Sequence, residues 1–130
     1  MGFKINKLTP TLGAEIKGID FSKTLDQDTH DKIYKVLLNN LVIFFRQTNI
    51  SPKEHLKFAS KFGQIDVPHP LYPKVKGYKN IVLLENDSKK PPDTDSWHTD
   101  LTFKKDQPFA SILVARNVPK IGGDTMWSSL

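Results

Sequence analysis

A histidine and an aspartate two residues apart carry the chemistry that this sequence suggests most strongly. His98 and Asp100 lie in the run Trp97-His98-Thr99-Asp100. Residues 101–103, which come next, have a strand-like composition. On a β-strand, side chains two residues apart point to the same side of the sheet. An imidazole nitrogen and a carboxylate oxygen would then meet, which is two thirds of the 2-His-1-carboxylate set that binds non-heme Fe(II). The spacing predicts a metal site at His98 and Asp100.

Such a site needs a third ligand. A second histidine should follow on a later strand, and the sequence reaches Leu130 without one. We therefore expect that this chain does not complete the site alone. One alternative is a metal-dependent hydrolase with His69 as the third ligand, because His69 is held rigidly between two prolines. A hydrogen-bonded structural pair without metal is the other open alternative.

Two further histidines, His30 and His55, fall in predicted helices that are rich in lysine and aspartate. We expect both side chains to face solvent. No nucleophile elbow accompanies the His-x-Asp pair, which argues against a Ser-His-Asp hydrolase. The sequence also lacks a Gly-rich phosphate loop of either common type.

The composition excludes several classes of protein. The chain has no cysteine, so it holds neither disulfides nor zinc–thiolate sites, as expected for a cytoplasmic protein. No apolar run is long enough to span a membrane. The formal net charge is +5, but basic residues are spread along the chain beside acidic ones, so we expect no nucleic-acid partner. Five lysines against two acidic residues between Lys74 and Lys90 favour a small anionic substrate.

The first part of the chain predicts strands, then helices. Residues 3–21 alternate loosely and predict two short strands with a turn. Residues 26–40 predict a helix with an apolar stripe, and the apolar run 41–45 predicts a buried strand. The residues Ser51-Pro52-Lys53-Glu54 form a capping box, which predicts a helix through Phe62 that Gly63 ends.

Strands and loops dominate the second part. A proline-rich loop over residues 67–76 precedes a predicted strand at 81–84, and a mobile polar loop over 85–96 leads into the His-x-Asp strand. A further strand is predicted at 109–114, before a turn at 119–123. This order predicts an α+β or mostly β fold, in a single domain over residues 1–130.

Several motifs in the same order closely resemble the taurine/2-oxoglutarate-dependent dioxygenase family. The apolar run 41–46 and the helix at 51–63 resemble its N-terminal part. The resemblance covers essentially the whole chain, which makes it more specific than any one motif. The remaining matches are Phe62-Gly63, His69-Pro70-Leu71-Tyr72-Pro73, residues 91–103 and Gly122-Gly123-Asp124-Thr125-Met126-Trp127.

The resemblance implies a fold and a set of site residues. The fold is a double-stranded β-helix, or jelly roll, with flanking helices, of which this chain would be a truncated N-terminal part. His98 and Asp100 match the first histidine and the carboxylate of the iron site. Thr125 matches a hydroxyl that holds the distal carboxylate of 2-oxoglutarate. The substrate contacts that the resemblance implies are His69 and Tyr72 at the sulfonate, and Leu101 on the apolar side.

Two departures from the family pattern matter. Thr94 stands where taurine dioxygenases carry an asparagine near the substrate, and its hydroxyl cannot reproduce both functions of an amide. This leaves room for another sulfonate, a sulfate ester or a related small acid. The second iron histidine and the arginines that pair with 2-oxoglutarate and with the substrate acid are absent from these residues.

Half a jelly roll also exposes sheet edges, so we expect a homo-oligomer or aggregation.

The activity that the resemblance implies is hydroxylation of a small organosulfonate such as taurine. Fe(II), 2-oxoglutarate and O2 would take part, and the products would be sulfite, an aldehyde, succinate and CO2. The polar loop at 85–96 would act as a lid over the site. The alternative hypothesis is a non-catalytic truncated fragment that binds a partner or an anion.

Overall fold

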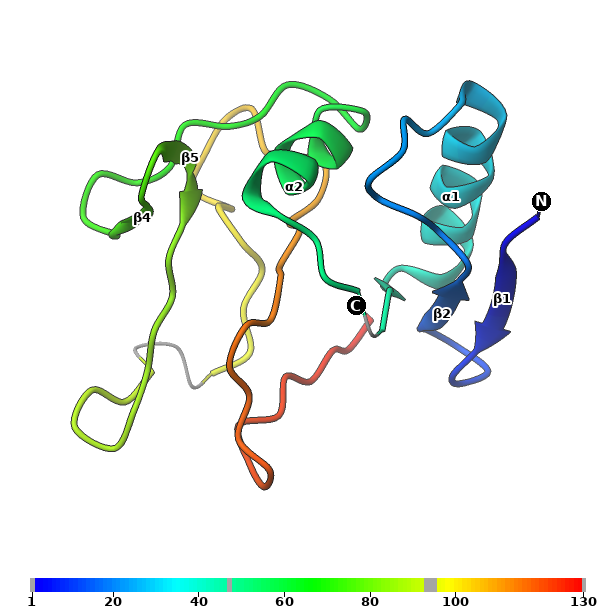
Figure 1. Cartoon of the computed structure of the whole chain (residues 1–130). Helices are drawn as coiled ribbons and strands as arrows, with labels where there is room; N and C mark the ends of the chain where they lie inside the picture. Colours follow the sequence, from blue (N-terminus) through cyan, green and yellow to red (C-terminus); the bar gives the residue numbers. More distant parts are fainter. Residues whose placement is uncertain (1, 47, 93–95, 130) are drawn as a thin grey trace. The chain divides into compact units, whose positions relative to one another are not determined.

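The computed structural model describes residues 2–46, 48–92 and 96–129. The chain divides into two compact units (Figure 1). The N-terminal unit comprises Met1–Glu54 with Val114–Leu130, and the central unit comprises His55–Leu113. Among the residues that the structure describes, no helix is both long enough and apolar enough to cross a bilayer.

A three-stranded sheet organises the N-terminal unit. Strand β1 (Lys4–Lys7) pairs antiparallel with β2 (Ala14–Lys17), which confirms the predicted pair of strands with a turn. Strand β3 (Ile43–Phe44) pairs parallel with β2 on its other edge, so that the order is β1-β2-β3. A parallel connection needs a crossover, and helix α1 (Gln27–Asn40) supplies it.

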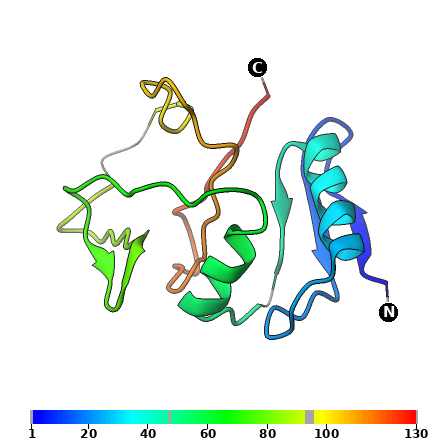
Figure 2. The same cartoon turned by 90° about the horizontal axis from the view of Figure 1, so that it is seen from above.

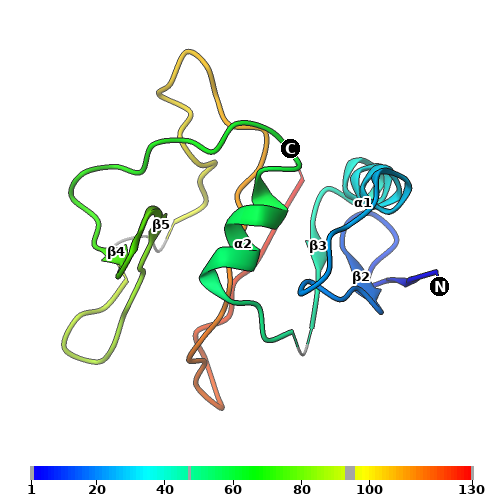
Figure 3. The same cartoon turned by 45° about the horizontal axis from the view of Figure 1, so that its top comes forward.

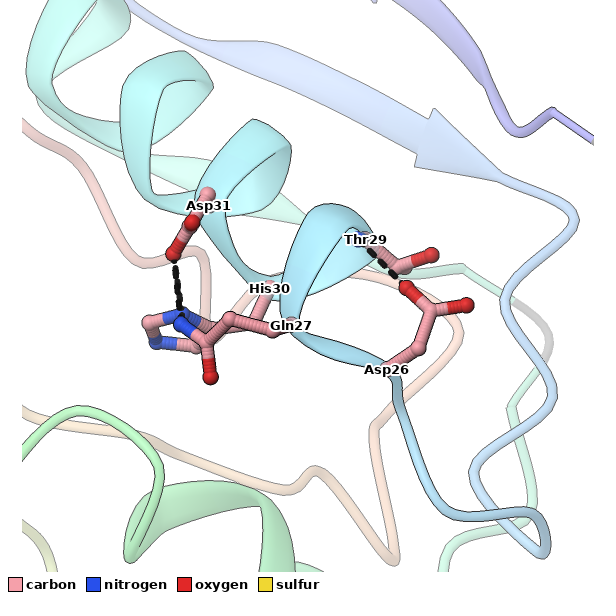
Figure 4. Close-up of polar contacts among 5 residues, drawn as sticks. All are labelled: Asp26, Gln27, Thr29, His30 and Asp31. Carbon is pink, nitrogen blue, oxygen red and sulfur yellow. Dashed lines mark hydrogen bonds and ion pairs between the residues drawn. The ribbon is translucent and has the colours of Figure 1, made fainter.

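Helix α1 begins where the sequence predicts. The Asp26 side chain accepts a hydrogen bond from the backbone N–H of Thr29, at 2.7 Å, and so caps the helix (Figure 4). This hydrogen bond is the largest cause that lowers the pKa of the Asp26 carboxyl. Asp28 in the first turn adds negative charge at the positive end of the helix dipole.

The core of the N-terminal unit lies between α1 and the sheet. Figure 2 shows α1 along one face of the strands. Ile33 is fully buried on the helix, and Ala14 and Ile16 are buried on β2. The amphipathic pattern of residues 26–40 therefore identified the face of the helix that packs.

The predicted buried strand at 41–45 is wrong in length and burial. Leu41 ends α1 with a φ of 65° and is 57% exposed. Its backbone N–H donates to the carbonyl of Leu37 at 2.7 Å, so this group is not available to a sheet. Only Ile43 and Phe44 pair as β3, and both are half-buried.

The last segment of the chain contacts the same unit. The ring of Trp127 meets that of Phe44 edge-on, with centroids 5.1 Å apart. Arg116 donates to the carbonyl of Ile50 at 2.6 Å. These contacts attach the segment that carries Thr125 to the sheet and to the residues before the next helix.

Helix α2 (Pro52–Ala59) confirms the predicted capping box. The Glu54 N–H lies 3.3 Å from the Ser51 hydroxyl, and the Ser51 N–H donates to the Glu54 carboxylate at 2.7 Å. The helix ends at Ala59, earlier than predicted. After Ala59 the backbone hydrogen bonds span three residues and not four: the Phe62 N–H donates to the Ala59 carbonyl at 3.0 Å, as in a 3₁₀ turn.

A small hairpin forms the ordered sheet of the central unit. Strand β4 (Lys74–Val75) pairs antiparallel with β5 (Tyr78–Val82), and Gly77 occupies the turn with a φ of 81°. The strand predicted at 81–84 therefore begins earlier and ends earlier than expected. Strand β4 occupies the end of the predicted proline-rich loop.

The strands predicted at 98–103 and 109–114 are wrong, because neither segment forms a ladder with any described residue. A strand requires a neighbour that takes its backbone hydrogen bonds. Leu101 also has a φ of 56°, which interrupts an extended backbone. The structure confirms a mixture of helices and strands, and the complete jelly roll stays a prediction.

Candidate active site

The His-x-Asp pair comes together in an irregular loop of the central unit. Nε2 of His98 lies 3.4 Å from Oδ1 of Asp100, and each side chain is about half exposed, at 51% and 53%. The loop conformation, and not a strand, produces this approach. The chain therefore places an imidazole nitrogen and a carboxylate oxygen side by side on an accessible surface.

A hydrogen bond at Nδ1 determines which nitrogen of His98 is available. Nδ1 lies 2.9 Å from the backbone carbonyl of Ser96. A carbonyl oxygen only accepts, so this contact requires the proton on Nδ1. In the neutral imidazole the lone pair is then on Nε2, the atom that faces Asp100. Histidines that bind metals are commonly oriented in this way by a hydrogen bond at the other ring nitrogen.

The Asp100 carboxylate is also oriented by a hydrogen bond, which comes from Ser111. Its Oδ2 accepts a hydrogen bond from the Ser111 hydroxyl at 2.7 Å, while Oδ1 faces His98. The two potential metal donors are thus Nε2 and Oδ1. At metal–ligand distances of about 2.1 Å and a right angle, two such donors lie about 3 Å apart. The observed 3.4 Å fits a divalent cation after a small adjustment.

No third ligand completes this pair within the described ranges 2–46, 48–92 and 96–129. No group of three or more histidine, cysteine, aspartate or glutamate side chains is arranged there to hold a metal ion. His69 therefore does not join His98 and Asp100 as the metal-dependent hydrolase hypothesis requires. The available geometry is that of two ligands on adjacent corners of a site.

Two of the residues predicted to contact the substrate, His69 and Tyr72, lie on one turn of the central unit. The rings of His69 and Tyr72 are arranged edge to face, with centroids 6.1 Å apart. The Lys74 ammonium donates to the carbonyls of His69 and Pro70, at 2.9 and 3.0 Å, and holds the turn closed. Two polar rings and a cation at one exposed turn suit a small anion.

The other predicted site residues are Thr94, Leu101 and Thr125. Thr94 lies outside the described residues. Leu101 is half-buried in the loop that carries Asp100, next to the candidate metal ligands. Thr125 is exposed and belongs to the N-terminal unit, where it follows Gly122 and Gly123, which both have positive φ. Its contact with 2-oxoglutarate stays a prediction.

The expectation that His30 and His55 face solvent is wrong. The His30 side chain is 14% exposed, and its Nδ1 lies 3.0 Å from Oδ1 of Asp31 (Figure 4). Its ring stacks on that of Tyr34 one helical turn away. Nε2 of His55 lies 3.1 Å from the carbonyl of Ile112, so α2 binds the extended stretch that runs beside it (Figure 3). Nδ1 of His30 and Nε2 of His55 thus make contacts within the fold.

Comparison with known proteins identifies the family. The sequence matches the family described as taurine catabolism dioxygenase TauD, TfdA over residues 4–130. The chain belongs to the TauD/TfdA family. Members of this family use Fe(II), 2-oxoglutarate and O2.

Two curated relatives carry names that refer to sulfate or sulfate esters. "Alkylsulfatase" of Acinetobacter baylyi is 42% identical over 127 residues, which is 97% of this chain and 39% of the relative. "Alpha-ketoglutarate-dependent sulfate ester dioxygenase" of Pseudomonas putida is 38% identical over 126 residues, which is 96% of this chain and 41% of the relative. The chain thus spans about two fifths of the length of these relatives.

Solved structures of the TauD/TfdA type also resemble this chain. A taurine dioxygenase from Burkholderia xenovorans superposes with a TM-score of 0.56 at 30% identity, over 59% of this chain and 28% of that chain. The shared arrangement of helices and strands supports the fold class.

One ion pair near the candidate TauD-type site could not be predicted from the sequence. Lys104 donates to the Asp66 carboxylate at 2.5 Å, across 38 residues. The Lys104 backbone N–H donates to the Leu101 carbonyl at 3.0 Å, which closes the turn after the His-x-Asp pair. Asp66 precedes the turn of His69 and Tyr72. The ion pair therefore ties the loop of His98 and Asp100 to the start of the segment that carries His69 and Tyr72.

Replacing Lys104 with methionine is expected to raise the pKa of Asp66 toward its ordinary value of 3.8. The hydrogen bond from Lys104 is the largest cause that lowers this pKa, and the backbone N–H of Val67 is the second. Because the folded pKa is lowered, the stability that the pair contributes is present above a pH of about 4 and is lost as the pH falls through the lowered value. An NMR titration of the Asp66 carboxyl carbon measures both pKa values. Equal values in the two proteins would contradict the assignment.

Proposed function

We propose that the complete protein containing this chain is an Fe(II)/2-oxoglutarate-dependent dioxygenase that cleaves a small alkyl sulfate ester. The observation that carries the proposal is the pair formed by Nε2 of His98 and Oδ1 of Asp100, 3.4 Å apart, in a chain of the TauD/TfdA family. The names of the relatives at 42% and 38% identity support a sulfate ester over taurine.

The chain's own residues have separate tasks in this reaction. His98 and Asp100 hold the metal, and the hydrogen bonds from Nδ1 of His98 and to Oδ2 of Asp100 keep the two donor atoms facing one another. A contact of the Thr125 hydroxyl with the distal carboxylate of 2-oxoglutarate stays a prediction that rests on the family resemblance. When bound, iron couples the oxidative decarboxylation of 2-oxoglutarate by O2 to hydroxylation of a C–H bond.

The turn of His69 and Tyr72 provides the recognition of the anion. Its ring N–H and phenol O–H groups are hydrogen-bond donors, and Lys74 holds the turn in place through two backbone carbonyls. A sulfate ester and a sulfonate both present three terminal oxygens on sulfur, so the same donors fit both. The carbon skeleton and the bridging ester oxygen distinguish the two, and the smaller side chain of Thr94 favours a substrate other than taurine.

The products distinguish the two substrates because different bonds break. Hydroxylation of the carbon that bears the ester oxygen gives a hemiacetal sulfate. Its C–O bond to sulfate then breaks, the hydroxyl loses its proton, and an aldehyde and sulfate form. Hydroxylation of the carbon that bears a sulfonate leads to cleavage of the C–S bond, and sulfite is released. Succinate and CO2 come from 2-oxoglutarate in both cases.

A product assay tests the proposal. The complete protein is supplied with Fe(II), 2-oxoglutarate and O2, with either hexyl sulfate or taurine, and sulfate, sulfite, succinate and aldehyde are measured. We expect sulfate, aldehyde and succinate in equal amounts from hexyl sulfate, and none of them with the His98→Ala variant. Sulfite from taurine with no sulfate from the ester would support the organosulfonate prediction instead. No consumption of 2-oxoglutarate with either compound would support the non-catalytic alternative.

The oligomeric state and the location of the protein in the cell stay predictions. Exposed apolar side chains such as Leu71, Phe103 and Ile121, at 84%, 77% and 92%, are compatible with a homo-oligomer or with aggregation of the chain alone. A cytoplasmic location would match the absence of cysteine.

A further inference from the structure

Ser111 contacts the candidate metal ligand Asp100 from a distant part of the central unit. Its hydroxyl donates to Oδ2 of Asp100 at 2.7 Å, across eleven residues of sequence. The other carboxylate oxygen, Oδ1, is the one that faces His98. The two oxygens of Asp100 therefore have different partners before any metal binds.

This difference matters for an iron site with open positions. A carboxylate can bind a metal through one oxygen or through both. A facial set of three ligands leaves three positions, and 2-oxoglutarate and O2 together need all of them. If both oxygens of Asp100 bound iron, one of these positions would be lost. A hydrogen bond from Ser111 to Oδ2 favours binding through Oδ1 alone.

The position of Ser111 is itself maintained by helix α2. The next residue, Ile112, has its carbonyl 3.1 Å from Nε2 of His55 on the helix. The stretch around Ser111 does not pair as a strand with any described residue, so this contact provides an anchor that a ladder would otherwise supply. A rigid helix thus supports the residue that orients Asp100.

The geometry points to Ser111 as a positioning residue that restricts Asp100 to binding iron through Oδ1. This inference rests on the proposed function, because it assumes that Asp100 binds iron. It concerns the hydroxyl alone. A residue that only fastened the loop would affect folding and leave the electronic environment of the bound metal unchanged.

The test compares Ser111→Ala with Ser111→Thr, which keeps the hydroxyl, in the complete protein. Each variant is titrated with Fe(II) and 2-oxoglutarate under anaerobic conditions, and the visible metal-to-ligand charge-transfer band is recorded. We expect Ser111→Ala to raise the Kd for Fe(II) about 10- to 100-fold and to shift the band. Ser111→Thr should reproduce the wild-type affinity and band. Because Ser111 is exposed, neither change should prevent folding, and circular dichroism checks this point.

Other outcomes overturn the inference. A Ser111→Ala variant with wild-type Kd and band would show that the hydroxyl does not position Asp100. Equal losses in Ser111→Ala and Ser111→Thr would show that the hydroxyl is not responsible. The nearly isosteric Ser111→Cys, a weak donor, should lie between wild type and alanine, and a wild-type result would also contradict the inference. His98→Ala distinguishes a failure of the inference on Ser111 from a failure of the proposed function. If the His98→Ala variant also binds iron with the wild-type Kd, the proposed function fails.

Discussion

Replacement of His98 by alanine is expected to raise the Kd for Fe(II) by more than about 100-fold, because loss of a ligand costs more than loss of an outer hydrogen bond. Nε2 of His98 is one of the two ligand atoms that the chain places together, and the hydrogen bond from Nδ1 to the Ser96 carbonyl leaves the lone pair of the neutral ring on Nε2. The change should abolish the charge-transfer band of the iron–2-oxoglutarate complex and with it all turnover. An anaerobic titration of the complete protein measures both effects.

The matched control is His69→Ala. His69 lies on the turn that we assign to the substrate anion, and its contacts are with Tyr72 and the backbone of its own segment. We expect a wild-type Kd for Fe(II) and a raised KM for the sulfate ester. If His69→Ala abolished metal binding, three-ligand coordination by His69, His98 and Asp100 would be correct, and the hydrolase hypothesis would replace the dioxygenase.

Helix starts were predictable because their signals are local. Asp26 caps α1 through the N–H group three residues later, and Ser51 and Glu54 cap α2 reciprocally over the same separation. The apolar stripe of residues 26–40 identified the packing face, which Ile33 occupies. Each of these features depends on residues within one or two turns of helix.

Strands were predicted less well because a strand depends on a partner. The segment 109–114 has a strand-like composition and is extended, yet no described residue pairs with it. The backbone around Leu101 turns instead, with a φ of 56°. The metal-ligand prediction assumed a strand at His98 and Asp100, and the side chains approach in a loop for a different reason, namely the contacts at Ser96 and Ser111.

Contacts between distant residues had no sequence signal at all. Lys104 and Asp66 are 38 residues apart, and the His55 contact with Ile112 spans 57. Neither pair belongs to a motif, lysine is ordinarily solvent-exposed, and histidine is of intermediate burial, so residue type gave no sign of either contact. The order of motifs along the chain identified the family, while the residues that orient its candidate ligands required the structure.

Ile33→Ala should cause the largest loss of stability of any single substitution considered. Ile33 is 0% exposed and is one of the two largest fully buried side chains among the described residues. Removal of its outer carbons leaves a cavity between α1 and the sheet, and such truncations cost about 2–5 kcal/mol. The total stability of a domain is about 5–15 kcal/mol, so the N-terminal unit would retain little of it. Urea unfolding followed by circular dichroism measures the difference.

Leu38→Ala on the same helix provides the control, because it removes the same type of side chain from a position that is 52% exposed. Its cost should stay below about 1 kcal/mol, as for other exposed positions. A large difference between the two variants would show that α1 is held by its buried face and not by helix propensity, which both substitutions slightly improve. Equal costs would contradict the packing of α1 on β2. Since the segment with Thr125 is attached to the sheet through Trp127 and Phe44, Ile33→Ala should also weaken that attachment as the unit unfolds.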